Sequence, residues 1–488
     1  MEILLFSSPT VQPDFDLIAR VPNLGIASIA GCINDICSVH VADVHGLKKK
    51  DHLAYLERSI KKYQPDLVGL SCMSFQYSDA LEMAKRVRQH GIPTVMGGYH
   101  PTLTYREIAD SPDSQYINFI IRGEGEATFR ELVRALPEGK FDHIRGLSHH
   151  NGTCFIHNPP RPILDVTRLR LPDRNARLIN KRFNIFGKAV DVVETSRGCL
   201  HGCKFCSINC MYGRTYRTFA LPRVIEDISR AVSHGARSVL FVDDNITQEP
   251  KRLMALCDAI IEHGLDHIHY HTQASTRGIA QVPGMARKMA DAGFKFVFLG
   301  IENTIGRNMD FFDKRSRGDE AEIAVDSLRD NHIIVSGGLV LGTPDDTKED
   351  LWSNFRAVKD MKVDIPIFNV TTPYPGTRLR QEMLDLGLVT NPDDFTRYDG
   401  LTANIRTRHM DSRQLQLEIW RMASRFYDIE WMKYNTIRRT YPLWFAKRTA
   451  RIYARYTRRK LLRWGKLRDS DDFFEEDLRN RSYNMSVC

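Results

Sequence analysis

The chain has 488 residues, of which 42% are apolar and 26% charged. These fractions are typical of a globular protein with room for two or three hydrophobic cores, and no uncharged apolar run is long enough to predict a transmembrane helix. The start of the chain, Met-Glu-Ile-Leu-Leu-Phe, lacks the basic region of a signal peptide. Ten cysteines in so long a chain do not indicate a disulfide framework, so we expect a cytoplasmic protein.

The formal net charge of +9 is concentrated near the C-terminus. Residues 433–468 hold thirteen Lys or Arg and no Asp or Glu, so the rest of the chain sums to −4 (+9 less 13). A charge confined in this way argues against a nucleic-acid-binding face spread over the protein.

Residues 1–137 alternate short apolar runs with amphipathic stretches. Near-continuous Val, Ile and Leu runs linked by helices are typical of a parallel sheet that is covered on both faces. We therefore predict a flavodoxin-like, Rossmann-type α/β domain over 1–137, with its ligand at the carboxyl ends of the strands. The expected strands are 2–6, 38–42, 66–71, 93–97 and 117–121, and two of the expected helices are 51–63 and 77–90.

Six residues near these strand ends are candidate ligand contacts: Asp43, His45, Ser71, Gly97, Gly98 and His100. Glycines there let the backbone approach a bulky ligand, although Gly97-Gly98 alone also suits an ordinary strand-to-helix turn. The series resembles the Asp-x-His-x-x-Gly, Ser-x-Leu and Gly-Gly motifs of cobalamin-binding domains, with Lys48 and Met73 replacing the last glycine and the leucine. The resemblance implies cobalamin bound base-off, often without a histidine on cobalt.

Two further features complete the N-terminal part. Glu124 and Glu126 follow the fifth expected strand, and we interpret them as favourable charges at a helix N-terminus. Residues 138–188 contain an Asn151-Gly152 hairpin turn followed by several prolines, which predicts a linker with a hairpin.

Three cysteines, Cys199, Cys203 and Cys206, are spaced C-x3-C-x2-C directly after an apolar run at 189–193. Three thiolates in one loop can each bind an iron of a four-iron cluster and leave the fourth iron open. Zinc is the alternative, because Cys210 could supply a fourth thiolate. A structural zinc site usually uses two separated ligand pairs, and no second pair is present, so the cluster is favoured and Cys210 is interpreted as a bystander.

Residues 189–390 repeat a strand and then a helix six times, with strands beginning near 191, 238, 267, 295, 333 and 365. This pattern predicts a partial (β/α)6 barrel over 189–390, whose chemistry gathers at the carboxyl ends of the strands. The candidate residues at those ends, besides the cysteines, are Asp243, Asp244, Gln273, Glu302 and Gly342. Each of them could also be an ordinary cap or turn residue.

The cysteine spacing, with Phe205 before the last cysteine, resembles the signature of the radical S-adenosylmethionine (SAM) superfamily. The resemblance implies a [4Fe-4S] cluster whose open iron binds SAM. It also implies that Glu302 holds the SAM ribose hydroxyls and that the turn at Gly342 passes over the adenine. Asp243 and Asp244 stand where many members carry the Gly-Gly-Glu that binds the SAM amino group.

Together the two resemblances point to the cobalamin-binding radical SAM enzymes. They imply a methyltransferase that places a SAM-derived methyl group on an unactivated carbon, through a 5′-deoxyadenosyl radical and methylcobalamin. Relatives such as the anaerobic Mg-protoporphyrin monomethyl ester cyclase and the hopanoid methylases leave cyclisation, rearrangement and lipid or tetrapyrrole substrates open, and a non-catalytic sensor is a third reading. A reducing donor of the flavodoxin or ferredoxin type is also implied.

Residues 391–488 are expected to form a helical C-terminal region. An amphipathic helix is predicted over 411–435, with Leu415, Ile419, Met422, Phe426 and Tyr427 on one side. The basic segment 433–468 interleaves cations with aromatic residues. It suits a solvated or interdomain helix, a peripheral contact with an anionic membrane at the cytoplasmic face, or, least of the three, RNA.

Overall fold

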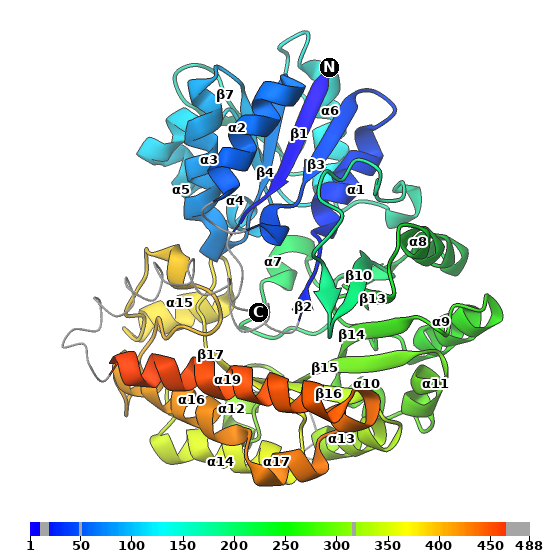
Figure 1. The fold of residues 1–488 in the computed structure, drawn as a ribbon. Helices are drawn as coiled ribbons and strands as arrows, with labels where there is room; N and C mark the ends of the chain where they lie inside the picture. Colours follow the sequence, from blue (N-terminus) through cyan, green and yellow to red (C-terminus); the bar gives the residue numbers. More distant parts are fainter. Residues whose placement is uncertain (10–18, 48–50, 315–318, 465–488) are drawn as a thin grey trace.

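Two β-sheets organise the protein, one in each half of the chain (Figure 1). The computed structural model describes residues 1–9, 19–47, 51–314 and 319–464. The first sheet lies above the second in Figure 1, and the carboxyl ends of its parallel strands face the second half of the chain. This arrangement confirms the predicted α/β fold of a Rossmann-type domain followed by a partial barrel and a helical C-terminal region.

The first sheet has the strand order β3-β1-β4-β5-β6-β7-β8, and its first five strands are parallel. Numbered along the chain, those five have the flavodoxin order 2-1-3-4-5. Their bounds are β1 (Glu2–Ser7), β3 (Ser38–Ala42), β4 (Leu67–Ser71), β5 (Thr94–Gly97) and β6 (Phe119–Ile121).

Helices cover both faces of this sheet. Ile3 and Leu5 of β1 pack on one face with α1 (Leu24–Ile33) and α6 (Gly125–Ala135). The alternate residues Leu4 and Phe6 pack on the other face with α2 (His52–Tyr63) and α3 (Tyr77–Gln89). All four β1 side chains are almost fully buried, because successive residues of a strand point to opposite faces and neither face meets water.

The hairpin of the expected linker extends the first sheet. β7 (Leu147–His150) pairs antiparallel with β6, and β8 (Phe155–His157) pairs antiparallel with β7. The turn between them is closed by Asn151, whose side-chain oxygen accepts hydrogen bonds from the backbone N–H groups of Thr153 and Cys154 at 3.0 and 2.9 Å.

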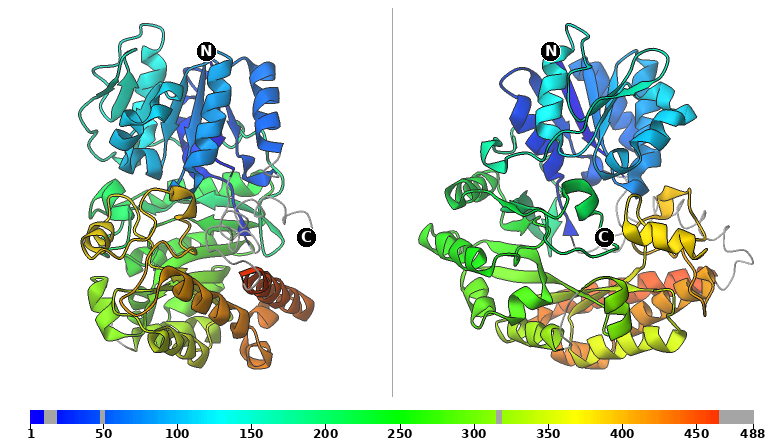
Figure 2. Two further views of the ribbon diagram at one scale, coloured as in Figure 1. Left: turned by 90° about the vertical axis from the view of Figure 1, so that its left-hand side faces the viewer. Right: turned by 180° about the vertical axis from the view of Figure 1, so that it is seen from behind.

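The second sheet contains six parallel strands in chain order and curls into an open half-barrel (Figure 2). The helices between the strands lie on its outer face, among them α8 (Leu221–Ser233), α9 (Pro250–Glu262), α13 (Glu320–Asp330) and α14 (Lys348–Asp360). The strands are β10 (Lys188–Val193), β13 (Ser238–Phe241), β14 (His269–Ser275), β15 (Phe294–Glu302), β16 (Ile334–Leu341) and β17 (Ile365–Val370).

A short segment of the first 137 residues belongs to the second sheet. β2 (Ala19–Arg20) pairs antiparallel with β9 (Asn184–Ile185), which in turn pairs with β10. The two halves of the chain are therefore joined through a sheet as well as through the linker, which the sequence did not predict.

The C-terminal region is helical, but the helix predicted over 411–435 is broken. α16 (Ser412–Phe426) ends where Asp428 accepts a hydrogen bond from the backbone N–H of Trp431 at 2.9 Å and starts α17 (Ile429–Tyr434). The prediction of one helix was wrong because an N-cap within the stretch satisfies the first N–H groups of a new one.

Of the five residues predicted on one side of this helix, Leu415, Ile419, Met422 and Phe426 lie in α16 and are buried, whereas Tyr427 follows the end of α16 and is half-buried. α18 (Ile437–Thr440) and α19 (Leu443–Trp464) follow, and α19 packs along α16. The last four residues of the basic segment lie outside the described residues. In the described parts of the chain, none of the helices combines the length and apolar content that a membrane crossing needs.

Candidate active site

A cavity of about 380 Å³ lies between the carboxyl ends of the first sheet and the loop that carries the three cysteines. The first sheet contributes Ser71, Gly97 and Gly98, three of the residues selected from sequence, and the barrel contributes Asp244. Gly98 has φ +101°, and a Cβ there would lie 2.6 Å from the carbonyl oxygen of Cys72, so only glycine fits this turn.

The other three candidates of the first domain are not part of the cavity lining. Asp43 is buried and accepts hydrogen bonds from Ser7 Oγ at 2.6 Å and from the backbone N–H of Asn23. His45 lies half-buried in the single turn Val44–Gly46 after β3. Asp43 thus ties the ends of β1 and β3 to the start of α1.

His100 is buried behind the cavity. Its Nδ1 lies 3.3 Å from Ser74 Oγ, and its ring packs on Tyr77 and Phe395 at centroid distances of 4.5 and 5.0 Å. Burial lowers the pKa of His100 to about 3, so the ring is neutral at physiological pH.

The cysteine loop leaves β10 after Val193 and is held by backbone contacts. Gly198 has φ +88°, a Cβ there would lie 2.2 Å from the carbonyl oxygen of Thr215, and its N–H donates to Asp244 Oδ2 at 2.7 Å. The N–H of Cys206 donates to the carbonyl oxygen of Cys203 at 3.2 Å. Cys203 and Cys206 therefore lie at the two ends of one tight turn.

Cys199, Cys203 and Cys206 are free, half-buried thiols. The neighbouring cysteines add to the rise in pKa that burial causes at Cys203 and Cys206. Burial raises the pKa of Cys203 to about 11 and of Cys206 to about 12. Among the described residues, no three His, Cys, Asp or Glu side chains converge closely enough to hold a single metal ion. A four-iron cluster makes a different demand, one thiolate for each of three irons, and the chemistry of this donor set fits it.

The two aspartates after β13 differ in what they do. Asp243 is fully buried and accepts hydrogen bonds from Thr195 Oγ1 at 2.6 Å and Ser196 Oγ at 2.5 Å, so it anchors the start of the cysteine loop. Asp244 lines the cavity, and burial raises its pKa to about 6. Asp244 is the one of the pair that faces a ligand-sized space.

Gln273 and Glu302 lie at the carboxyl ends of β14 and β15. Gln273 Nε2 donates to the carbonyl oxygen of Asp243 at 2.8 Å. Glu302 has φ +64°, a strained conformation for a residue with a Cβ, and its carboxylate pairs with Lys314 Nζ at 2.5 Å. Both belong to the rim of the barrel on the cysteine-loop side.

Gly342 and Phe205 have structural contacts. Gly342 has φ +90°, its N–H donates to Asp346 Oδ2 at 2.8 Å, and a Cβ there would lie 2.9 Å from Leu415 Cδ2. The ring of Phe205 meets Phe312 edge-on at 5.2 Å. Phe205 therefore packs the cysteine loop against the segment that follows β15.

Several residues that line the cavity were not predicted from the sequence. Tyr99 and Tyr212 line the cavity, hydrogen-bond to each other and have pKa values raised by burial. Glu194 and Arg197 also line it, and burial raises the pKa of Glu194 to about 7. The available signal was position, because Glu194 and Arg197 are five and two residues before the first cysteine.

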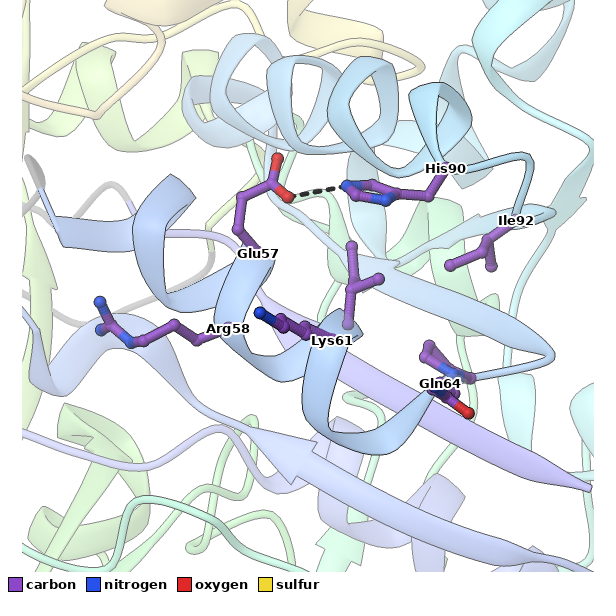
Figure 3. Close-up of a pocket in the computed structure, with 8 residues that line it drawn as sticks. Glu57, Arg58, Lys61, Gln64, His90 and Ile92 are labelled. Atoms are coloured by element: carbon purple, nitrogen blue, oxygen red, sulfur yellow. Dashed lines mark hydrogen bonds and ion pairs between the residues drawn. The ribbon is translucent and has the colours of Figure 1, made fainter.

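A second hollow lies between the C-terminal ends of α2 and α3 (Figure 3). It is lined by Arg58, Lys61 and Gln64, among others, and Glu57 pairs there with His90 at 2.7 Å. These helix ends are at the amino edge of the parallel strands, away from the cysteine loop. An exposed ion pair of this kind contributes little to stability. The residues that line this hollow do not form a group of converging reactive side chains.

Comparisons with known proteins agree with this geometry. Residues 19–133 match the family model of the B12 binding domain, and residues 193–358 match that of the radical SAM superfamily. An uncharacterised methyltransferase of Pyrococcus horikoshii is 30% identical over 437 residues, which span 88% of this chain and 92% of the relative. The anaerobic magnesium-protoporphyrin IX monomethyl ester cyclase of Cereibacter sphaeroides is 26% identical over 76% of this chain and 61% of its own length.

A solved structure has the same fold. The radical S-adenosylmethionine methyltransferase TsrM from Kitasatospora setae, with cobalamin and a [4Fe-4S] cluster bound, aligns with a TM-score of 0.65 at 16% identity, over 79% of this chain and 75% of that one. The fold and the three-thiol loop define a radical SAM protein. With its B12-binding domain, the chain belongs to the family of cobalamin-binding radical SAM enzymes.

Proposed function

We propose that the protein is a cobalamin-dependent radical SAM methyltransferase that acts on an unactivated carbon. The observation that carries the proposal is the cavity, because one wall is the ligand edge of the B12-binding domain and the other adjoins the three-thiol loop. The Pyrococcus relative, named a methyltransferase and matched over almost its whole length, supports the reaction class.

The residues around the cavity have different proposed roles, according to where they lie. When bound, the cluster and SAM supply a 5′-deoxyadenosyl radical, and cobalamin carries the methyl group. Cys199, Cys203 and Cys206 would each bind one iron of the cluster. Glu302, once it releases Lys314, offers two carboxylate oxygens to a pair of ribose hydroxyls.

The test is a product analysis that needs no knowledge of the substrate. The anaerobically reconstituted protein, given SAM, cobalamin and a strong reductant, is expected to form 5′-deoxyadenosine from cleaved SAM. It should also form S-adenosylhomocysteine from SAM that has lost its methyl group, and only when cobalamin is present. Both products are quantified by mass spectrometry.

Other outcomes would favour the alternatives. 5′-Deoxyadenosine without cobalamin-dependent S-adenosylhomocysteine would contradict methyl transfer and favour cyclisation or rearrangement, the chemistry of the Cereibacter relative. Formation of neither product by an iron-loaded protein would favour a sensor. We propose a small molecule, a lipid or a tetrapyrrole as substrate, and a flavodoxin or ferredoxin as the physiological reductant.

We also propose that α19 rests on an anionic membrane at its cytoplasmic face. The exposed side of α19 carries Lys447, Arg448, Arg451, Arg455, Arg458 and Arg459. Leu443 and Trp444 at one end and Leu462 at the other are 48%, 61% and 59% exposed. At 1.5 Å per residue the helix from Leu443 to Leu462 is about 28 Å long. Each cation close to an anionic bilayer contributes about 1 kcal/mol to the free energy of membrane binding.

Vesicle sedimentation tests this contact. The protein should bind vesicles rich in phosphatidylserine, and the triple variant Arg451→Glu, Arg455→Glu, Arg458→Glu should bind at least about tenfold less, because like charges repel. Reversal of Arg58, Lys61 and Lys62 on α2, equally exposed cations, is the matched control and should change little. If the unaltered protein ignores such vesicles at physiological salt, or binds only RNA, the membrane contact is wrong.

A further inference from the structure

Arg197 is a buried arginine at the junction of the two halves of the chain. It lies in the loop after β10, two residues before Cys199, and it is only 8% exposed. Its Nε donates to Glu194 at 2.8 Å, its Nη1 to Glu124 at 3.0 Å and its Nη2 to Glu126 at 2.6 Å. Each of the three guanidinium nitrogens of Arg197 thus donates to a different carboxylate.

Two of these carboxylates belong to the B12-binding domain. Glu124 is the N-cap of α6, and Glu126 stands in the first turn of that helix. Glu126 also accepts a hydrogen bond from Ser28 of α1 at 3.0 Å. The ion pairs of Arg197 therefore connect the cysteine loop to both helices on one face of the first sheet.

The group, which we call the Arg197 cluster, comprises Arg197, Glu124, Glu126, Glu194 and Arg217. Arg217 pairs with Glu124 at 2.8 Å from the other side. Three carboxylates and two guanidinium groups share this buried space. Removing one partner from such a group leaves an uncompensated buried charge, which is strongly destabilising, whereas the intact group fixes its members in one geometry.

The Arg197 cluster is also part of the cavity wall. Arg197 and all three of its glutamate partners line the cavity. A displacement of Arg197 moves the loop that carries the thiols, and a displacement of Glu124 or Glu126 moves the first turn of α6. The same ion pairs thus set the separation between the two walls.

We propose that Arg197 is a positioning residue that fixes the B12-binding domain over the cysteine loop. The consequence for catalysis rests on the proposed function, since it requires cobalamin in the cavity. The mechanical link itself does not. It can be measured on the chain without cofactors, so its failure and the failure of the proposed function are distinguishable.

The experiment is hydrogen–deuterium exchange on the cofactor-free protein. In Arg197→Met, peptides from the first turn of α6 and from the cysteine loop should both exchange at least about tenfold faster, which corresponds to 1.4 kcal/mol of opening free energy. Arg197→Lys keeps the charge but loses the fork, so it should give a smaller increase in both segments.

Two further variants make the result decisive. Arg197→Met leaves buried carboxylates unpaired, so a companion variant adds Glu126→Gln and Glu194→Gln and leaves Glu124 with Arg217. It should fold and still show faster exchange in both segments. The matched control is Arg174→Met, which removes another buried arginine, paired with Asp191 at 2.8 Å and Asp227 at 2.5 Å but absent from the cavity lining. It should leave the α6 peptide unchanged.

Faster exchange in the cysteine loop alone, with α6 as slow as in the unaltered protein, would overturn the proposal, and so would no change in either segment. In the reconstituted protein, the electron-spin coupling between cob(II)alamin and the reduced cluster provides a second readout. It depends on their separation and should weaken or broaden in Arg197→Met at full iron and cobalamin loading. An unchanged coupling would also contradict the proposal.

Discussion

At the scale of single residues, the cysteines of the loop differ from Cys210 in their surroundings. Cys203 and Cys206 lie on one tight turn, whereas Cys210, on α7 (Ile208–Tyr212), donates its thiol proton to the carbonyl oxygen of Gly376 at 3.2 Å. Cys199 has a comparable contact, with Gln248 Oε1 at 3.5 Å, so a thiol hydrogen bond alone does not distinguish Cys210 from the cysteines of the loop. We expect Cys210 to be a bystander because it lies on the helix that follows the loop and contacts a different segment of the barrel.

The first prediction uses this contrast. Cys203→Ala should lose the iron-dependent visible absorbance and all SAM cleavage, because an iron loses its protein ligand. Cys210→Ala should retain both. Iron content after anaerobic reconstitution measures the outcome, and loss of iron from the second variant would mean that Cys210 is a ligand.

His271 gives a pH prediction. It is fully buried in β14, neither ring nitrogen has a hydrogen-bond partner, and burial lowers its pKa to about 3. The unfolded chain, with a pKa near 6.5, therefore binds more protons below that pH, so stability is complete above about pH 6.5 and falls as the pH drops towards 3. Between pH 7 and pH 5 this one group lowers the free energy of unfolding by about 2 kcal/mol.

Between pH 7 and pH 5, the free energy of unfolding of His271→Leu should therefore fall by about 2 kcal/mol less than that of the unaltered protein. Urea unfolding at the two pH values measures the difference. The pKa of His100 is also lowered by burial, to about 3, so both proteins should still lose some stability as the pH falls. Equal losses in the two proteins would contradict the assignment of His271 as a buried neutral group.

At the scale of elements, most of the parallel strands of both sheets could be predicted because they are nearly continuous apolar runs, although β14, with the sequence HYHTQAS, is not. The observed β3 (Ser38–Ala42) matches its expected range, and β4 and β5 each begin one residue later than expected. Buried parallel strands must be apolar on both faces, so the local sequence carries the information.

The contacts that join elements could not be predicted in this way. β2 has two residues and therefore no periodicity, and its partner β9 is more than 160 residues away. Arg197 and Glu126 are 71 residues apart. His100 follows a glycine pair, and nothing in the local sequence indicated that its ring packs on Tyr77 and Phe395. Such pairings depend on the assembled fold.

Gly342 provides a prediction for the packing of α16 on the barrel. Gly342→Ala should destabilise the protein by about 2–4 kcal/mol, since alanine is strained in the left-handed region and its Cβ would overlap Leu415. The urea midpoint measures the change. Gly306→Ala is the control, because a Cβ there meets nothing within 4 Å and its φ is not in the left-handed region. Equal midpoints for Gly342→Ala and the unaltered protein would contradict this account.

At the scale of the whole molecule, the two sheets present their reactive edges to each other. The B12-binding domain places Gly97 and Gly98 on one side of the cavity, and the barrel places Asp244 and the cysteine loop on the other. Neither half encloses the cavity alone. The Arg197 ion pairs and the β2–β9 pairing both connect the two halves of the chain.

The measurement that tests the central claim most directly is transfer of a labelled methyl group in the cell. The protein is expressed anaerobically with cobalamin in a host that is fed methyl-deuterated methionine, and extracts are compared by mass spectrometry with those of a Cys203→Ala strain. We predict one metabolite that carries a deuterated methyl group only when the intact protein is present. Identical labelling in the two strains, in a host shown to contain the substrate, would contradict methyl transfer.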